Sequence, residues 1–108
     1  MVNFVRSRQK AEQQIKKFGT LAKLRRSGVD RDCWAAEADL SAGERRAMKN
    51  FSTKVYLIST EGLTEPPNKE DSLITFIGAL ELPPLRQVAP VKPLIQGGIL
   101  IYYELQVE

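Results

Sequence analysis

The stretch from Gly97 to Val107 constrains the fold most, because apolar side chains occupy every second position along it. Such alternation is typical of a β-strand with one buried face. Gly97 and Gly98 supply the backbone freedom that a tight turn into this strand requires. We therefore expect the stretch to be a strand of the main sheet and not a tail. The apolar positions are Ile99, Ile101, Tyr103, Leu105 and Val107.

Residues 4–18 predict an amphipathic helix, since apolar positions recur at helical spacing and most polar residues lie between them. Asn3 is a suitable N-cap, and Gly19 follows two lysines as a C-terminal stop. A strand over residues 20–26 is expected directly after this stop. The helix positions on the apolar face are Phe4, Arg8, Ala11, Ile15 and Phe18.

Residues 53–107 predict a β region of short strands. The strand at 53–60 is apolar on both faces, so either both faces are core or the second face meets a partner. A polar connection at 62–71 contains Pro66 and Pro67, which cannot continue a ladder. Ile77 and Gly78 mark a hairpin turn.

Residues 86–91 are expected to pair with the final strand across the turn at 96–98. Pro90 and Pro93 restrict this pairing to an edge or bulged position. With the amino-terminal helix, the pattern predicts a mainly β fold: a small β-barrel or sandwich of five to six short strands with a long inserted loop.

Residues 27–52 break the β pattern and are expected to form that loop. Ser27 and Gly28 open it, charges are mixed, and Trp34 stands among alanines. The sequence from Ser41 to Glu44 has the form of a capping box and predicts a short helix over 42–49. Loops this long are usually functional or mobile. A variable surface loop without a role is the alternative.

The length of 108 residues fits a single domain over 1–108. There is no apolar run of about eighteen residues for a membrane span, and Arg6, Arg8 and Lys10 stand where a secretory signal would be apolar. We expect a soluble cytoplasmic protein. Cys33 is the only cysteine and cannot form an internal disulfide, so it is expected to be structural.

Charge is distributed unevenly along the chain. Residues 1–54 hold 13 Lys or Arg against 6 Asp or Glu, whereas residues 55–108 hold 3 against 7. The basic half could face nucleic acid or an acidic partner. A solvated helix face and loop is the explanation we favour.

The sequence offers no recognisable catalytic or metal site. It contains no histidine, which removes the usual general base and the commonest metal ligand. Asp30 and Asp32 have the first spacing of a calcium loop, but Trp34 and Ala35 occupy the following ligand and glycine positions. Glu70 and Asp71 are expected to be turn residues. We expect no enzymatic activity, no cofactor and no metal.

The order of these elements resembles the small head-closure, or head-tail joining, proteins of tailed bacteriophages and prophages. The resemblance rests on the helix ending at Gly19, the strand running into Arg25 and Arg26, the long loop and the β region. Three local motifs carry it: the acidic lead into a strand at 70–75, the hairpin at 77–78, and the closing turn and strand at 93–99 with Tyr103.

The resemblance implies a structural protein that docks below the portal, helps to retain packaged DNA and forms a platform for tail attachment. Its partners would be the portal or adaptor and tail proteins of the same phage, further copies in a ring, and packaged DNA, with no membrane. It would act in the host cytoplasm during assembly and in the virion neck. Our hypothesis is that the 27–52 loop faces the channel or an adjoining ring. The interaction residues are Arg25, Arg26, Arg31, Trp34, Arg45, Arg46 and Lys49.

A small basic nucleic-acid-binding β-barrel is the competing class, in which arginines track phosphates and exposed aromatics stack on bases. Four aromatic residues lie in apolar alternation, where burial is expected, and Trp34 is the one aromatic in the polar loop. A tail-completion protein is the other alternative. The four aromatic residues are Tyr56, Phe76, Tyr102 and Tyr103.

Overall fold

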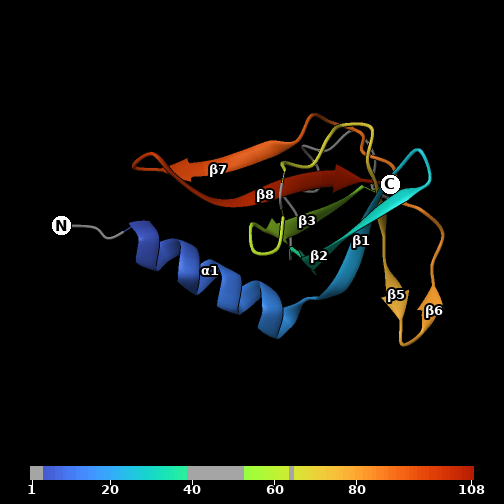
Figure 1. The fold of residues 1–108 in the computed structure, drawn as a ribbon, viewed down its shortest axis with the longest axis horizontal. Helices are drawn as coiled ribbons and strands as arrows, with labels where there is room; N and C mark the ends of the chain where they lie inside the picture. Colours follow the sequence, from blue (N-terminus) through green and yellow to red (C-terminus); the bar gives the residue numbers. More distant parts are fainter. Residues whose placement is uncertain (1–3, 39–52, 64) are drawn as a thin grey trace.

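A computed structural model describes residues 4–38, 53–63 and 65–108. In these residues one helix precedes a six-stranded antiparallel sheet and a two-stranded ribbon, which confirms the predicted mainly β fold. Figure 1 shows the helix along one side of the sheet and the ribbon projecting beyond it. The elements are α1 (Phe4–Phe18), β1 (Thr20–Arg26), β2 (Val29–Glu37), β3 (Lys54–Ser59), β4 (Ser72–Ile74), β5 (Phe76–Ile77), β6 (Leu80–Glu81), β7 (Lys92–Gln96) and β8 (Ile99–Val107).

Helix α1 has the bounds that its sequence predicts. Lys16 and Lys17 lie in its last turn, where cations interact favourably with the helix dipole. The amide of Gly19 donates to the carbonyl of Ile15 at 2.7 Å. A β-carbon at position 19 would collide with the backbone of Ile15 and Ala35. Glycine is therefore needed where the helix ends, because the chain passes so close to β2.

The predicted loop over 27–52 is wrong in its first part, because Val29–Glu37 forms strand β2. Ser27 and Gly28 make the turn from β1, with φ of 52° and 77°. Two-residue hairpins with positive φ at both central positions match the twist of the strands they join. β2 then pairs with β1 from Val29 opposite Arg26 onward. The short helix expected over 42–49 lies outside the described residues.

The inward positions of β2 explain why its sequence did not predict a strand. Arg31 and Cys33 lie opposite the buried Leu24 and Ala22 of β1, and Ala35 is itself buried, so two of the three are small while the third is charged. Strands are normally recognised from large β-branched and aromatic residues at such positions. β2 forms because its hairpin with β1 and its pairing with β3 supply the ladder.

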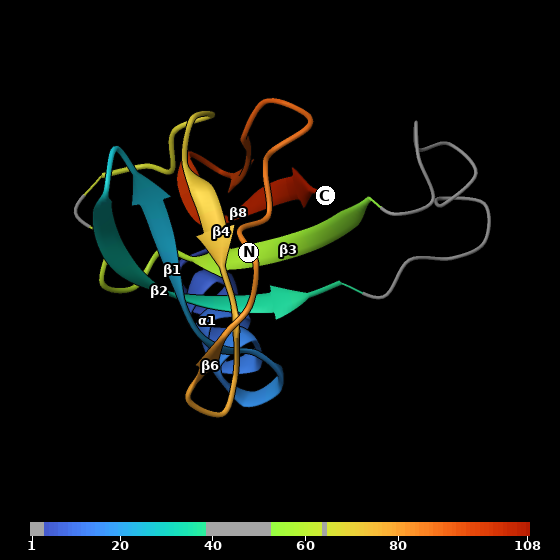
Figure 2. The ribbon, with the colours of Figure 1, turned by 90° about the vertical axis from the view of Figure 1, so that its right-hand side faces the viewer.

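The sheet has the order β4-β1-β2-β3-β8-β7 and curls into a half-barrel (Figure 2). Residues 85–88 span its open side. Leu85 exchanges two backbone hydrogen bonds of 2.9 Å with Leu73 of β4. Arg86 exchanges two with Glu108, just beyond β8, at 2.9 and 3.0 Å. This short segment therefore links the first strand of the sheet order to the fifth.

The core fills the inner face of the curled sheet. The alternation predicted for β8 is confirmed, because Ile101, Tyr103, Leu105 and Val107 are all buried. Burial raises the pKa of the Cys33 thiol to about 12, which disfavours the reactive thiolate. The core cluster consists of Ala22, Leu24, Cys33, Ala35, Ile58, Leu73, Tyr103, Leu105 and Val107.

The outer face of the sheet is covered in part by α1. Strand β3 illustrates the arrangement: Ile58 belongs to the core, whereas Leu57 lies on the opposite face towards the helix. The two apolar faces predicted for this strand therefore both meet other parts of the same chain. Ile58 is fully buried, whereas Leu57 is half-buried beneath the helix, so the outer face is packed less tightly at this position.

Strand β7 forms the continuous ladder with β8 across the Gly97 turn, whereas the predicted segment 86–91 pairs with the end of β8 only at an isolated bridge between Gln87 and Val107. β7 is an edge strand, and its pairing is irregular between Leu94 and Ile95. The predicted edge position with a bulge is therefore right, but the strand lies a few residues later. An edge that carries Lys92, Pro93 and a bulge is protected against pairing with another chain.

The predicted hairpin around Ile77 and Gly78 is confirmed as the β5–β6 ribbon. Phe76 lies opposite Glu81, and Ile77 lies opposite Leu80. Gly78 has a φ of 60°, which an L side chain adopts only with strain.

We expect Leu24→Ala to lower the free energy of unfolding by about 2–5 kcal/mol, because the change leaves a cavity among fully buried side chains. Leu21→Ala is the matched control: it makes the same change three residues earlier in β1, at a half-exposed position. Urea denaturation of both variants checks the prediction. If both variants lost the same free energy of unfolding, the conclusion that the core lies on the inner face of the sheet would be contradicted.

Candidate functional site

Arg25 joins three strands through two carboxylates. Its guanidinium donates to Asp30 of β2 at 2.6 and 3.0 Å. It also donates to Glu81 of β6 at 3.1 and 3.3 Å. Such bidentate pairs fix the relative orientation of the guanidinium and the carboxylate as well as contributing energy. Arg25 therefore anchors the β5–β6 hairpin to the β1–β2 hairpin, and it is not an isolated cation.

Arg26 and Arg31 converge on the carboxylate of Asp71, whose side chain is fully buried. Arg31 donates to Oδ2 of Asp71 at 2.7 Å, and Nε of Arg26 lies 3.6 Å from Oδ1. Both arginines also approach the exposed carboxylate of Glu65, Arg31 at 3.3 Å and Arg26 at 3.7 Å. Arg31 and Arg26 pair with Leu24 and Val29 in the β1–β2 ladder. They therefore continue the inward row of side chains at the end of the barrel.

Asp71 also organises the turn that precedes β4. The amide of Asn68 donates to Oδ2 of Asp71 at 2.8 Å, and the amide of Asp71 donates to the carbonyl of Asn68 at 3.0 Å. Nε2 of Gln87 donates to the carbonyls of both residues, at 2.6 and 2.9 Å. The expected turn role of Asp71 is thus correct, but its ion pairs also tie this turn and the closing segment 85–88 to the sheet.

The other predicted interaction residues divide into two groups. Trp34 lies in β2, half-buried, and not in a polar loop. The ammonium of Lys16 stands 5.9 Å from the centre of its ring, a cation–π distance. The remaining three predicted residues, Arg45, Arg46 and Lys49, lie outside the described residues.

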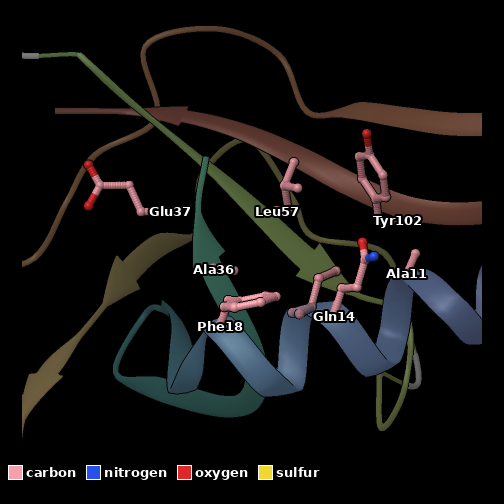
Figure 3. A pocket seen from close by; sticks show the side chains of 8 residues that line it. Ala11, Gln14, Phe18, Ala36, Glu37, Leu57 and Tyr102 are labelled. Atoms are coloured by element: carbon pink, nitrogen blue, oxygen red, sulfur yellow. The ribbon is translucent and has the colours of Figure 1, made fainter. Parts of the chain in front are cut away.

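A groove of about 260 Å³ runs between α1 and the outer face of the sheet. One wall is the predicted apolar face of the helix, at Ala11, Ile15 and Phe18 (Figure 3). The opposite wall is built from β2, β3 and β8. The groove exists because the small side chains of Ala11 and Ala36 leave space there. The sheet residues that line it are Ala36, Glu37, Leu57 and Tyr102, and Gln14 lies at its helix side.

α1 is held by polar contacts to the loop after β3. Nζ of Lys16 lies 2.6 Å from a carboxylate oxygen of Glu61, and the hydroxyl of Thr60 donates to Glu12 at 2.8 Å. These contacts position the helix above the sheet while the groove stays open. The sequence predicts the helix wall, but not the space between the helix and the sheet.

Apolar side chains are exposed around the end of α1 and at the hairpin. Phe18 is 75% exposed, Ile77 67% and Leu80 64%. A second hollow of about 220 Å³ connects these regions, because Phe18 shares its lining with Phe76 and Leu82. Phe76 and Leu82 flank the exposed hairpin positions Ile77 and Leu80, and apolar side chains exposed in one region of a surface mark interaction sites. We therefore define the candidate site as the groove and the β5–β6 hairpin together.

No family model, no curated protein and no solved structure matches this chain. No helix in residues 4–38, 53–63 or 65–108 has both the length and the apolar content that a bilayer crossing needs. Within the same residues, no three Cys, Asp or Glu side chains come together as a set that could hold a metal ion.

We expect Asp71→Asn to lower the free energy of unfolding by about 1–3 kcal/mol, because it removes the charged partner of Arg31 from a buried position while Arg31 keeps its contact with Glu65. Glu61→Gln is the control, since its ion pair with Lys16 is largely exposed, and such pairs contribute at most about 1 kcal/mol. Chemical denaturation at pH 7 gives both values. A loss for Asp71→Asn no larger than that of the control would contradict a structural role for the buried pair.

Hydrogen bonds from Arg25 are the main cause of a lowered pKa at Asp30, relative to the ordinary 3.8. Because folding lowers this pKa, Asp30 contributes stability above pH 3.8 that is lost as the pH falls through the folded value. We expect Arg25→Gln to shift the Asp30 titration to higher pH, measured by NMR of the side-chain carboxyl. Lys92→Gln, at an exposed position of the edge strand, should leave the titration unchanged.

Proposed function

We propose that this chain is a structural subunit of the neck of a tailed bacteriophage or prophage. It docks below the portal, helps to retain packaged DNA and forms a platform to which the tail attaches. Its partners are the portal or adaptor protein, tail proteins and further copies of the chain. The observation that carries the proposal is the exposed apolar surface at Phe18, Ile77 and Leu80, because it fits a subunit that buries more surface on assembly.

The motifs that resemble head-closure proteins support this proposal. The acidic lead into β4 holds Asp71, which ties the turn to the sheet. The second motif is the β5–β6 hairpin, which exposes apolar side chains. The third is the turn between β7 and β8, the strand whose side chains complete the core. Each resembling segment thus has a defined part in the fold.

The ion pairs of Arg25, Arg26 and Arg31 weigh against the competing nucleic-acid-binding barrel. Each guanidinium already faces at least one carboxylate. To bind a phosphate, the guanidinium would have to leave its carboxylate or interact with the carboxylate and the phosphate together. Protein cations bind nucleic acid by neutralising its phosphates, which releases the counterions condensed on them. Arginines already paired with carboxylates neutralise phosphates less effectively.

We expect the purified protein to cosediment with DNA-filled, tail-less phage heads and to increase the fraction of heads that retain DNA. Emptied heads and free DNA are the controls. Binding to filled heads at saturation, followed by tail joining, supports the head-closure function.

Binding to free DNA alone would replace this proposal with a nucleic-acid module. Binding to isolated tails, without binding to heads, would replace it with a tail-completion function. The same preparation serves all arms, so the outcomes are directly comparable.

A further inference from the structure

We propose that the chain binds a second copy of itself head to tail, with the β5–β6 hairpin of one copy seated in the groove beneath α1 of the next. The inference rests on the proposed function, which calls for several copies of the chain around one axis. It goes further by naming the two surfaces that meet. They are different surfaces, so the contact is heterologous and leads to a ring or to an open chain.

The hairpin is built as a rigid apolar projection. Ile77 and Leu80 lie opposite each other across the two strands, and both are about two-thirds exposed. Arg25 fixes the base of the hairpin through Glu81 on one side and Asp30 on the other. A projection that is already ordered loses little conformational entropy on binding. In Figure 1 it extends away from the sheet, beyond the end of α1.

The groove has the size and lining that such a projection needs. Its volume is about 260 Å³, whereas an apolar protein cavity of about 150 Å³ accepts a benzene molecule. There is thus room for the ends of two aliphatic side chains. The lining residues Ala11, Ile15 and Leu57 offer an apolar floor, and the ring of Tyr102 stands at one side (Figure 3).

The charges beside the two surfaces are complementary. The hairpin itself carries one charged side chain, the carboxylate of Glu81, and Arg25 at its base is shared with Asp30. The groove lining holds one carboxylate, Glu37, and α1 beside it carries exposed Lys10 and Lys17, which have no ion pair within the described part of the chain, so the helix side of the groove is cationic. Opposite charges at the rim of an interface steer the partners and fix their orientation.

Other surfaces are less suited to contact between copies. The edge of β7 is protected by Lys92, Pro93 and its irregular pairing. The arginines at the end of the barrel are already engaged with Asp71 and Glu65. Val29 and Ile95 are also exposed, but neither lines the groove or the hollow at Phe18.

Two variants test the contact from its two sides. Ile77→Asp with Leu80→Asp removes the apolar projection, and Val29→Asp is its control because Val29 is 66% exposed in a different turn. Gln14→Trp fills the groove, and Gln13→Trp is its control, since Gln13 is exposed but does not line the groove. All these positions are exposed, and circular dichroism with thermal unfolding verifies that each variant folds.

Sedimentation velocity of the pure proteins, at concentrations up to about 1 mM, measures self-association. We expect wild type and both controls to associate, and each test variant to associate at least tenfold more weakly. An equimolar mixture of the two test variants retains one intact contact, between the hairpin of one and the groove of the other. It should therefore form dimers and stop there.

A wild type that stays monomeric, test variants that associate like their controls, or a mixture that forms no dimer would overturn the inference. Binding of wild type to DNA-filled heads is measured separately. Head binding without self-association would overturn this contact and leave the proposed function standing. Self-association through the hairpin without head binding would overturn the proposed function and leave this contact standing.

Discussion

The buried carboxylate of Asp71 is the interaction on which the closure of this fold depends. Arg26 and Arg31 extend the inward rows of β1 and β2 past the apolar core, so two cations stand at the end of the barrel. Removing charges from water is unfavourable unless they are paired and hydrogen-bonded. Asp71 pairs with both arginines, and Gln87 donates a hydrogen bond to the backbone carbonyl of Asp71. The closing segment 85–88 is therefore fixed to the sheet by polar contacts at the point where apolar packing ends.

The two faces of the sheet are packed differently, and this difference leaves the chain with its candidate site. The inner face is filled by large side chains such as Leu24 and Ile58. On the outer face, Ala11 of the helix meets a sheet surface that includes Ala36, and a groove remains between them. The hairpin, meanwhile, exposes Ile77 and Leu80. One chain thus carries an apolar hollow and an apolar projection, a combination suited to repeated contact between identical subunits.

The success of sequence-based prediction differed between elements for identifiable reasons. β8 and α1 were predictable because their apolar residues recur at the period of the structure they form. β2 was not, because its inward positions carry Cys33, Ala35 and the charged Arg31. The arginines were identified as interaction residues, but their partner is a carboxylate about forty positions away in the chain. Nothing local in the sequence pairs Arg31 with Asp71, since the contact exists only once the turn before β4 reaches β2.

Periodicity and turn chemistry in the sequence determined the helix, its glycine stop, the final strand, the β5–β6 hairpin and the mainly β class. These features depend on residues a few positions apart, whose side chains share a face or set a dihedral angle. The tertiary structure alone decided the order of the strands, the closing role of residues 85–88, the burial of Asp71 and the groove beneath α1. Each of these depends on which distant segments meet and on how much space their side chains leave between them, and neither quantity is encoded in any local pattern.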